Sequence, residues 1–153
     1  MNVKIESICE NLIFLENVTR WIYEEFVRPY RDDLTYEELV LKEKNFINET
    51  WPIRFVAIVD DKCVGTVSIV DNDLKCSNYT PWLSGLYVDV PYRNKKIGEQ
   101  LIEHVKNFAK SLGYKELFLR TEHASGYYKR LGWQYIETYD DGKLKPDVFK
   151  FKL

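Results

Sequence analysis

The feature that most limits how this chain can fold is a change of hydrophobic period between residues 82 and 112. Residues 82–89 read as a strand, whereas the segment 99–112 carries apolar side chains at helical spacing. A turn over residues 91–98 joins the two, and Gly113 is a natural stop for the helix. We therefore expect a strand, a tight turn and an amphipathic helix in succession.

The turn is basic, because Arg93, Lys95 and Lys96 lie within four residues. A helix N-terminus leaves backbone N–H groups without partners and carries about half a positive charge. Gly98 lets the backbone approach an anion without a Cβ in the way. Such a place binds phosphate groups, and a pyrophosphate suits it best. Taken alone, however, a turn of this kind is more often a solvated basic loop before an ordinary helix.

The rest of the chain supplies further strands and helices in mixed order. The expected elements are a strand at 3–8, helices at 12–27 and 35–47, strands at 55–59, 64–70 and 82–89, a helix at 99–112, a strand at 116–121, a short helix at 125–131, and strands at 133–139 and 148–153. Thr35 is expected to cap the second helix, with Glu38 three residues on. This order predicts a mixed α/β, or α+β, fold in a single domain over residues 1–153.

Composition narrows the class of protein. The 153 residues carry a formal net charge of −2, so the charge does not indicate binding to nucleic acid or to an anionic membrane surface. Cys9, Cys63 and Cys76 lack the spacing of a disulfide framework or zinc ribbon, so we expect reduced thiols in a cytoplasmic protein. No apolar run approaches a membrane span. The only histidines, His104 and His123, lack metal-ligand spacing, so no metal is expected, and His104 should be solvated.

Two stretches resemble sequence motifs of the GNAT superfamily of N-acetyltransferases. Residues 86–101 resemble its acetyl-CoA motif, and residues 124–133 resemble the motif that follows. The fitting positions are Val88, Arg93 and Gly98 in the first and Ala124, Tyr128, Gly132 and Trp133 in the second. The resemblance implies a GNAT fold, with a mixed, mostly antiparallel central sheet, about four flanking helices and splayed strands at the cofactor site. It also implies acetyl-CoA as donor substrate and a primary amine as acceptor.

The resemblance also implies roles for individual residues. The cofactor-binding residues would be Leu86, Tyr87, Val88, Arg93, Asn94, Lys95, Lys96, Ile97, Gly98, Glu99, Thr121, Ser125 and Tyr128. Tyr128 would be the general acid for the leaving thiolate, unless it is only a core aromatic. Glu122 is the first choice for general base, through a water, and Asp89 is the second. Glu122 could instead be a carboxylate that the helix dipole stabilises.

The sequence departs from the family pattern at two places. Lys96 stands where the first glycine of the turn is usual, and a positive φ there would cost of order 1 kcal/mol or more. Thr121 stands where the family often has Asn. These departures motivate an alternative, a non-catalytic acyl-CoA-binding sensor or scaffold. The acceptor is open between a protein N-terminus, a lysine, a polyamine and an aminosugar, and a homodimer is possible.

Overall fold

The computed structural model describes residues 1–74 and 77–153, so Cys76, expected to carry a reduced thiol, lies outside the described residues. The strands are β1 (Lys4–Ser7), β2 (Ile53–Val59), β3 (Lys62–Val70), β4 (Trp82–Val88), β5 (Glu116–Thr121), β6 (Gln134–Thr138) and β7 (Asp147–Lys152). The α-helices are α1 (Leu15–Ile22), α2 (Tyr36–Glu43), α3 (Ile97–Ser111) and α4 (Ser125–Arg130). Short 3-10 turns are η1 (Ile8–Glu10), η2 (Leu12–Phe14), η4 (Lys44–Ile47) and η5 (Val90–Tyr92), and η3 (Tyr23–Val27) is a π-helical turn.

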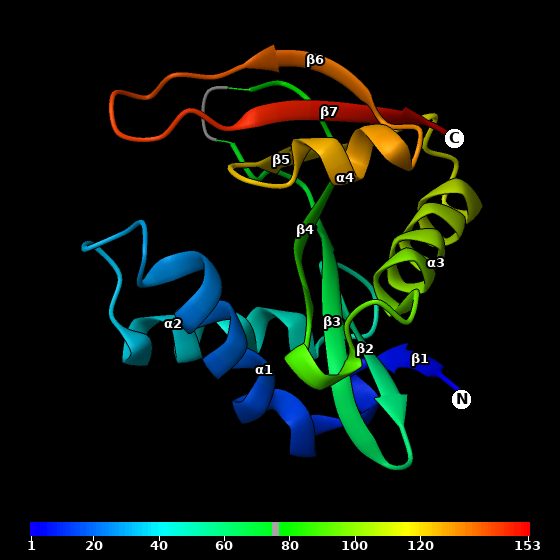
Figure 1. Cartoon of the computed structure of the whole chain (residues 1–153). Coiled ribbons are helices and arrows are strands. Elements are labelled where there is room, and N and C mark those ends of the chain that lie inside the picture. Colours follow the sequence, from blue (N-terminus) through cyan, green and yellow to red (C-terminus); the bar gives the residue numbers. More distant parts are fainter. Residues whose placement is uncertain (75–76) are drawn as a thin grey trace.

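The seven strands form one sheet in the order β1-β2-β3-β4-β5-β7-β6. Every neighbouring pair is antiparallel except β4 and β5, which run parallel and share a single residue pair, Trp82 with Phe118. Beyond that pair the two strands diverge, as Figure 1 shows. The mixed, mostly antiparallel sheet with splayed strands is therefore confirmed.

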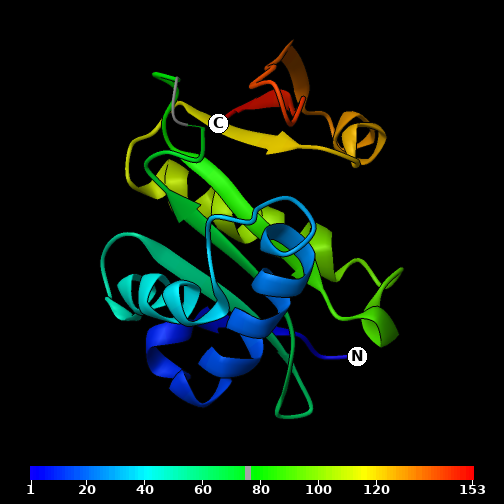
Figure 2. The same cartoon turned by 90° about the vertical axis from the view of Figure 1, so that its left-hand side faces the viewer.

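Helices cover both faces of the sheet. α3 packs on one face, whereas α1 and α2 lie on the other (Figures 1 and 2). The larger core cluster contains Leu101 and Val105 of α3, both fully buried, together with inward side chains of the central strands. A second cluster joins Val18 and Ile22 of α1 to Val56 of β2. Among the described residues, no helix is long and apolar enough to cross a bilayer.

The segment expected as one helix over residues 12–27 is instead divided into a 3-10 turn, α1 and the π turn η3. Leu12, the first residue of the expected helix, is 53% exposed. Past Ile22 the next fully core-facing residue is Val27 rather than Phe26, because the π turn inserts one extra residue into the helical repeat. Hydrophobic spacing thus located this helix but not its register near the end.

Several local expectations are confirmed. The Thr35 side chain accepts a hydrogen bond from the Glu38 N–H at the start of α2, and Gly113 ends α3 with a φ of +90°. The expectation that His104 is solvated is wrong, because its ring packs edge-on against Phe55 of β2 at 4.5 Å. Burial there lowers the pKa of His104 below its ordinary value.

Candidate active site

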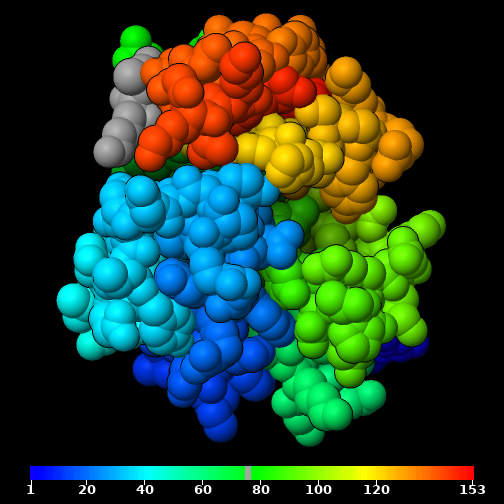
Figure 3. Space-filling view, turned by 60° about the vertical axis from the view of Figure 1, so that its left-hand side comes forward, coloured from blue at the N-terminus to red at the C-terminus, as the bar shows by residue number. Residues whose placement is uncertain are grey.

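The gap between β4 and β5 opens onto two cavities. The first has a volume of about 520 Å³ and runs from the free edge of β4 to the turn before α3. It is lined by Glu25, Leu86, Tyr87, Val88, Tyr92, Arg93, Asn94, Lys96, Ile97, Gly98, Glu99, Ala124, Tyr127 and Tyr128. In Figure 3 the surface is hollowed between the N-terminal helices in blue, the turn in green and the segment of β5 and α4 in yellow.

The turn before α3 ends in a strained residue. Lys96, at the N-cap position, adopts the left-handed conformation with φ 63° and ψ 19°, and Asn94 has a φ of 61°. Asn tolerates this region well, whereas a lysine pays a steric cost there. The side chain of Lys96 makes no capping hydrogen bond to α3, so the N–H groups of the first turn can serve an anion. The positive φ of Lys96 gives a physical reason why the family usually has glycine at the corresponding position.

Gly98 allows α4 to come close to the start of α3. A Cβ built on Gly98 would lie 2.9 Å from the hydroxyl oxygen of Tyr127, closer than real Cβ contacts. Burial, then the charge of Glu99, raises the pKa of Tyr127 to about 12, so its hydroxyl is neutral at physiological pH. Packing against Tyr127 therefore disfavours a side chain at position 98.

Arg93 fixes the end of β4. Its Nε donates a hydrogen bond of 2.8 Å to the carbonyl of Val88, and its guanidinium lies 5.3 Å from the ring centroid of Tyr87. These contacts hold the side chain along the wall of the first cavity. Arg93 and the turn line the same cavity, so the guanidinium can add charge-assisted hydrogen bonds to a phosphate bound there.

The second cavity, of about 530 Å³, lies on the α1 and α2 side of the gap. It is lined by Ile22, Glu25, Phe26, Val27, Tyr30, Arg31, Leu34, Leu39, Lys42, Glu43, Phe46, Arg54, Ser68, Val70, Asn72, Asp73, Leu83, Ser84, Gly85, Leu86, Leu119, Arg120, Thr121, Glu122, His123, Ala124, Tyr128 and Leu144. Four residues line both cavities: Glu25, Leu86, Ala124 and Tyr128. We call these four residues the junction.

Tyr128 is the buried hydroxyl of the junction, with 8% of its surface exposed. Its ring packs edge-on against Tyr127 and Trp133 at centroid distances of 5.2 and 6.0 Å. Burial and the neighbouring Tyr127 raise the pKa of Tyr128 well above its ordinary value. The hydroxyl thus stays protonated at neutral pH and can donate a hydrogen bond into the cavities.

A polar cluster bridges the diverging strands at the second cavity. Arg120 of β5 donates to Glu122 at 2.7 Å and to the carbonyl oxygen of Asp73 at 3.3 Å. The carboxyl group of Asp73 is hydrogen-bonded to the Ser84 side chain on β4. Burial raises the pKa of Asp73 to about 6, although Arg120 and Ser84 oppose the shift. The cluster places a weakly acidic carboxyl group on this wall.

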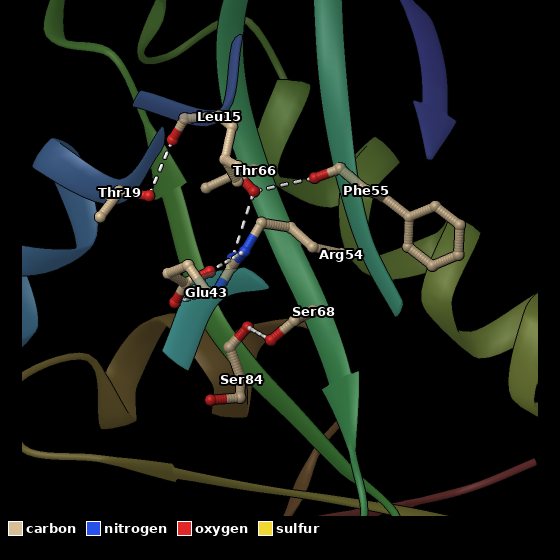
Figure 4. A network of polar contacts seen from close by, with 8 residues as sticks. All are labelled: Leu15, Thr19, Glu43, Arg54, Phe55, Thr66, Ser68 and Ser84. Atoms are coloured by element: carbon tan, nitrogen blue, oxygen red, sulfur yellow. Dashed lines mark hydrogen bonds and ion pairs between the residues drawn. The ribbon is translucent and has the colours of Figure 1, made fainter. Parts of the chain in front are cut away.

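A buried ion pair lines the second cavity. Figure 4 shows its polar contacts. Arg54 donates from Nε and Nη2 to the two carboxylate oxygens of Glu43, at 3.0 and 3.2 Å, and from Nη1 to Thr66 at 3.3 Å. The guanidinium also lies under Gly85, whose φ is +60°. Between the pairs Ser68–Ser84 and Thr66–Tyr87 the register of β3 and β4 shifts. This bulge at Gly85 changes the direction of β4 just before Leu86.

Ten of the residues expected to bind the cofactor line the first cavity. Three do not: Lys95 is outside its lining, Thr121 lines the second cavity and accepts from the Ala124 N–H, and Ser125 donates to Asp147 at 2.5 Å. Glu122 lines the second cavity. Asp89 lines neither and accepts from the Val90 N–H.

Sequence reasoning missed four residues that line the first cavity. They are Glu25, Tyr92, Ala124 and Tyr127. Tyr92, Ala124 and Tyr127 lie within the two motifs and could have been included on that ground. Glu25 is more than 60 residues before the first motif. The family resemblance placed it only in an acidic, aromatic segment that walls the acceptor pocket in similar proteins, with a solvated face as the alternative. Among residues 1–74 and 77–153, no group of three or more His, Cys, Asp or Glu side chains could hold a metal ion.

The sheet is splayed between β4 and β5, a cavity lies at this gap, and the N-terminus of α3 offers free backbone N–H groups. These features are those expected of the acetyltransferase fold. The sequence model of the acetyltransferase (GNAT) family matches residues 15–133. The chain belongs to this family, as the resemblance of its motifs implied. A comparison with curated protein sequences finds no match.

Solved structures share this fold over nearly the whole chain. An acetyltransferase of the GNAT family from Staphylococcus aureus Mu50 is 20% identical with a TM-score of 0.75, and 99% of each chain is covered. An aminoglycoside 6'-N-acetyltransferase complexed with coenzyme A is 14% identical with a TM-score of 0.74, covering 99% of this chain and 97% of that one. PaiA N-acetyltransferase from Thermoplasma acidophilum, also in complex with coenzyme A, is 21% identical with a TM-score of 0.72 and full coverage of both chains.

Proposed function

We propose that this protein transfers the acetyl group of acetyl-CoA to a primary amine by direct attack in a ternary complex. Residues 1–153 would act as a single N-acetyltransferase domain. The observation that carries the proposal is the first cavity, which joins the free edge of β4 to the donor-rich turn before α3. A pantetheine arm can pair with the edge of β4, and a pyrophosphate can bind at the turn before α3. Two solved structures of the same fold contain coenzyme A.

The turn would hold the pyrophosphate through the first backbone N–H groups of α3, with Arg93 and Lys96 adding positive charge. The segment 86–88 would hold the pantetheine arm by main-chain hydrogen bonds, which replace the missing partners of β4. A backbone N–H of this segment would face the thioester carbonyl and stabilise the oxyanion. The bulge at Gly85 supports this role, because it changes the direction of the strand directly before that segment.

In the reaction, the amine nitrogen forms a bond to the carbonyl carbon, the carbon–sulfur bond breaks, and a proton leaves the nitrogen. A lysine-like ammonium with a pKa of about 10.4 is deprotonated in only about one molecule in 2,500 at pH 7. Glu122 remains our proposed base, acting through a water. Its Oε1 is engaged with Arg120 at 2.7 Å, which leaves Oε2 to receive that water.

Tyr128 would act on the leaving thiolate. Its raised pKa makes it a much weaker acid than a thiol with a pKa of about 8.5. Its proposed contribution is therefore a hydrogen bond to the developing thiolate. Coenzyme A leaves as the thiolate, while the proton of the amine passes through the water to Glu122. Its position at the junction supports this role, because the donor and the acceptor would meet there.

Calorimetric titration with acetyl-CoA tests the donor site, with desulfo-coenzyme A and ATP as controls. We expect micromolar binding that depends on the pantetheine arm, and binding matched by ATP would contradict the donor assignment. Coenzyme A release is then measured with a lysine-containing peptide, spermidine and kanamycin. Tyr128→Phe should lose about 100-fold or more in turnover and keep its affinity for acetyl-CoA.

The second candidate function is a non-catalytic acyl-CoA sensor, favoured by Lys96 and Thr121. Such a protein would bind acetyl-CoA with no amine-dependent release of coenzyme A. As to compartment, we propose the cytoplasm. Cys9 and Cys63 are free thiols, which supports a reducing environment.

A further inference from the structure

We propose that Glu25 receives the ammonium group of the acceptor at the junction of the two cavities, and that the acceptor is therefore a cationic primary amine. The inference rests on the proposed acetyl transfer and adds the residue that orients the nucleophile. Of the four junction residues, Leu86 and Ala124 are apolar and Tyr128 is neutral. Glu25 is the one residue there that carries a charge.

The π turn explains how a glutamate comes to this place. The Arg28 N–H donates to the Tyr23 carbonyl at 2.8 Å, five residues back. In a continued α-helix, the residues three and four positions after buried Ile22 would share its core-facing side. In η3 the next buried residue is Val27 instead. Glu25 is thereby released from the core side and lines both cavities. Turns of this kind are frequent at functional sites.

The helix that carries Glu25 is anchored to β4. The Trp21 ring lies 5.1 Å from the ring of Tyr87, and the Cδ1 atom of Ile22 would be 3.2 Å from a Cβ on Gly85. Both contacts lie within one helical turn of Glu25. They fix it next to the segment that would hold the thioester.

Within the described part of the chain, Glu25 is also the one glutamate of the second cavity that has no ion pair. Glu43 and Glu122 pair with Arg54 and Arg120, whereas Glu25 has no ion pair among residues 1–74 and 77–153. Three of the four cations lining the second cavity, the two named and Arg31, already hold a carboxylate. An ammonium entering here therefore finds an unpaired negative charge at the junction.

Tyr30 lines the second cavity together with Glu25 and Glu122. Its pKa is raised by burial and then by the charges of Glu122 and Glu25. Its hydroxyl therefore lies in the field of both carboxylates. Because Glu25 lines both cavities and Glu122 lines the second, an amine bound to Glu25 would share a cavity with the proposed base and with the segment that would hold the thioester.

The test uses the full chain, with the amine among spermidine, kanamycin and a lysine-containing peptide that wild type turns over fastest. Glu25→Gln should raise the KM for that amine by about 10-fold to 100-fold, the cost of a lost charge-assisted hydrogen bond. The KM for acetyl-CoA and the melting temperature should not change. Glu25→Asp, which keeps the charge, should recover part of the loss.

Glu24→Gln is the matched control. Glu24 is the neighbouring residue of the same π turn, lines neither cavity and pairs with Arg28 at 2.7 Å. An unchanged amine KM in Glu25→Gln overturns the inference, as does an equal change in Glu24→Gln. If wild type binds acetyl-CoA but turns over no amine, the proposed transfer itself fails and this inference falls with it.

Discussion

Replacing Lys96 by glycine should stabilise the protein, although it removes a cation from the proposed phosphate turn. Lys96 holds a left-handed conformation, with φ 63° and ψ 19°, which costs a residue with a Cβ about 1–2 kcal/mol. Glycine avoids this cost but gives the unfolded chain extra freedom worth about 0.5–1 kcal/mol. The difference leaves a gain of about 0.5–1 kcal/mol in the free energy of unfolding. The melting temperature should then rise by about 1–4 °C.

Thermal denaturation of the ligand-free protein, followed by circular dichroism, measures the effect. Lys95→Gly is the control, because it removes the same charge from the same turn at a residue that has no positive φ. It should be neutral or destabilising. If Lys96→Gly melts no higher than wild type, or if Lys95→Gly raises the melting temperature equally, strain at residue 96 is refuted. Lys96→Gly should also weaken acetyl-CoA binding by about 2-fold to 5-fold at low salt.

Three further results are expected. Arg54→Met should cost about 3–5 kcal/mol of stability in urea unfolding because it leaves the buried Glu43 unpaired, whereas Glu43→Leu combined with it should cost much less. Gly98→Ala should weaken acetyl-CoA binding in calorimetry through the 2.9 Å contact with the Tyr127 hydroxyl, and adding Tyr127→Phe should restore most of it. Because the pKa of Asp73 is raised from 3.8 to about 6, wild type should lose stability relative to Asp73→Asn as pH rises between these values and keep a constant difference above them.

The turn and the helix that follows it could be predicted from the sequence because their determinants are local. Gly113 ends the helix through its own backbone conformation, and the basic residues of the turn are consecutive or nearly so. The strain at Lys96 could also be anticipated, since glycine is usual there in the family. Each of these inferences depends on residues that are close to one another in the sequence.

The acceptor side could not be predicted in the same way, because its geometry depends on packing between distant segments. Phe26 and Val27 are both apolar, so the hydrophobic pattern fits an α-helical register and a π turn equally well. His104 was misplaced for a related reason, since helical spacing gives its side of the helix but not the ring of Phe55 that covers it. The place of Glu25 at the junction also depends on distant segments, because Leu86 and Tyr128, which line the same cavities, come from β4 and α4.

The single residue pair that joins β4 and β5 in the sheet has a consequence for the folded state itself. Two strand edges face each other across the gap with their hydrogen-bonding groups unmatched beyond Trp82 and Phe118. A pantetheine arm between them would complete the sheet in the manner of an eighth, non-peptide strand. Amide hydrogens of residues 84–88 on that edge should therefore exchange quickly in the free protein and slowly in the complex. At a ligand concentration 100 times Kd, binding adds about 2.7 kcal/mol to the free energy of unfolding. The stability of the folded protein would therefore depend on the concentration of its own substrate.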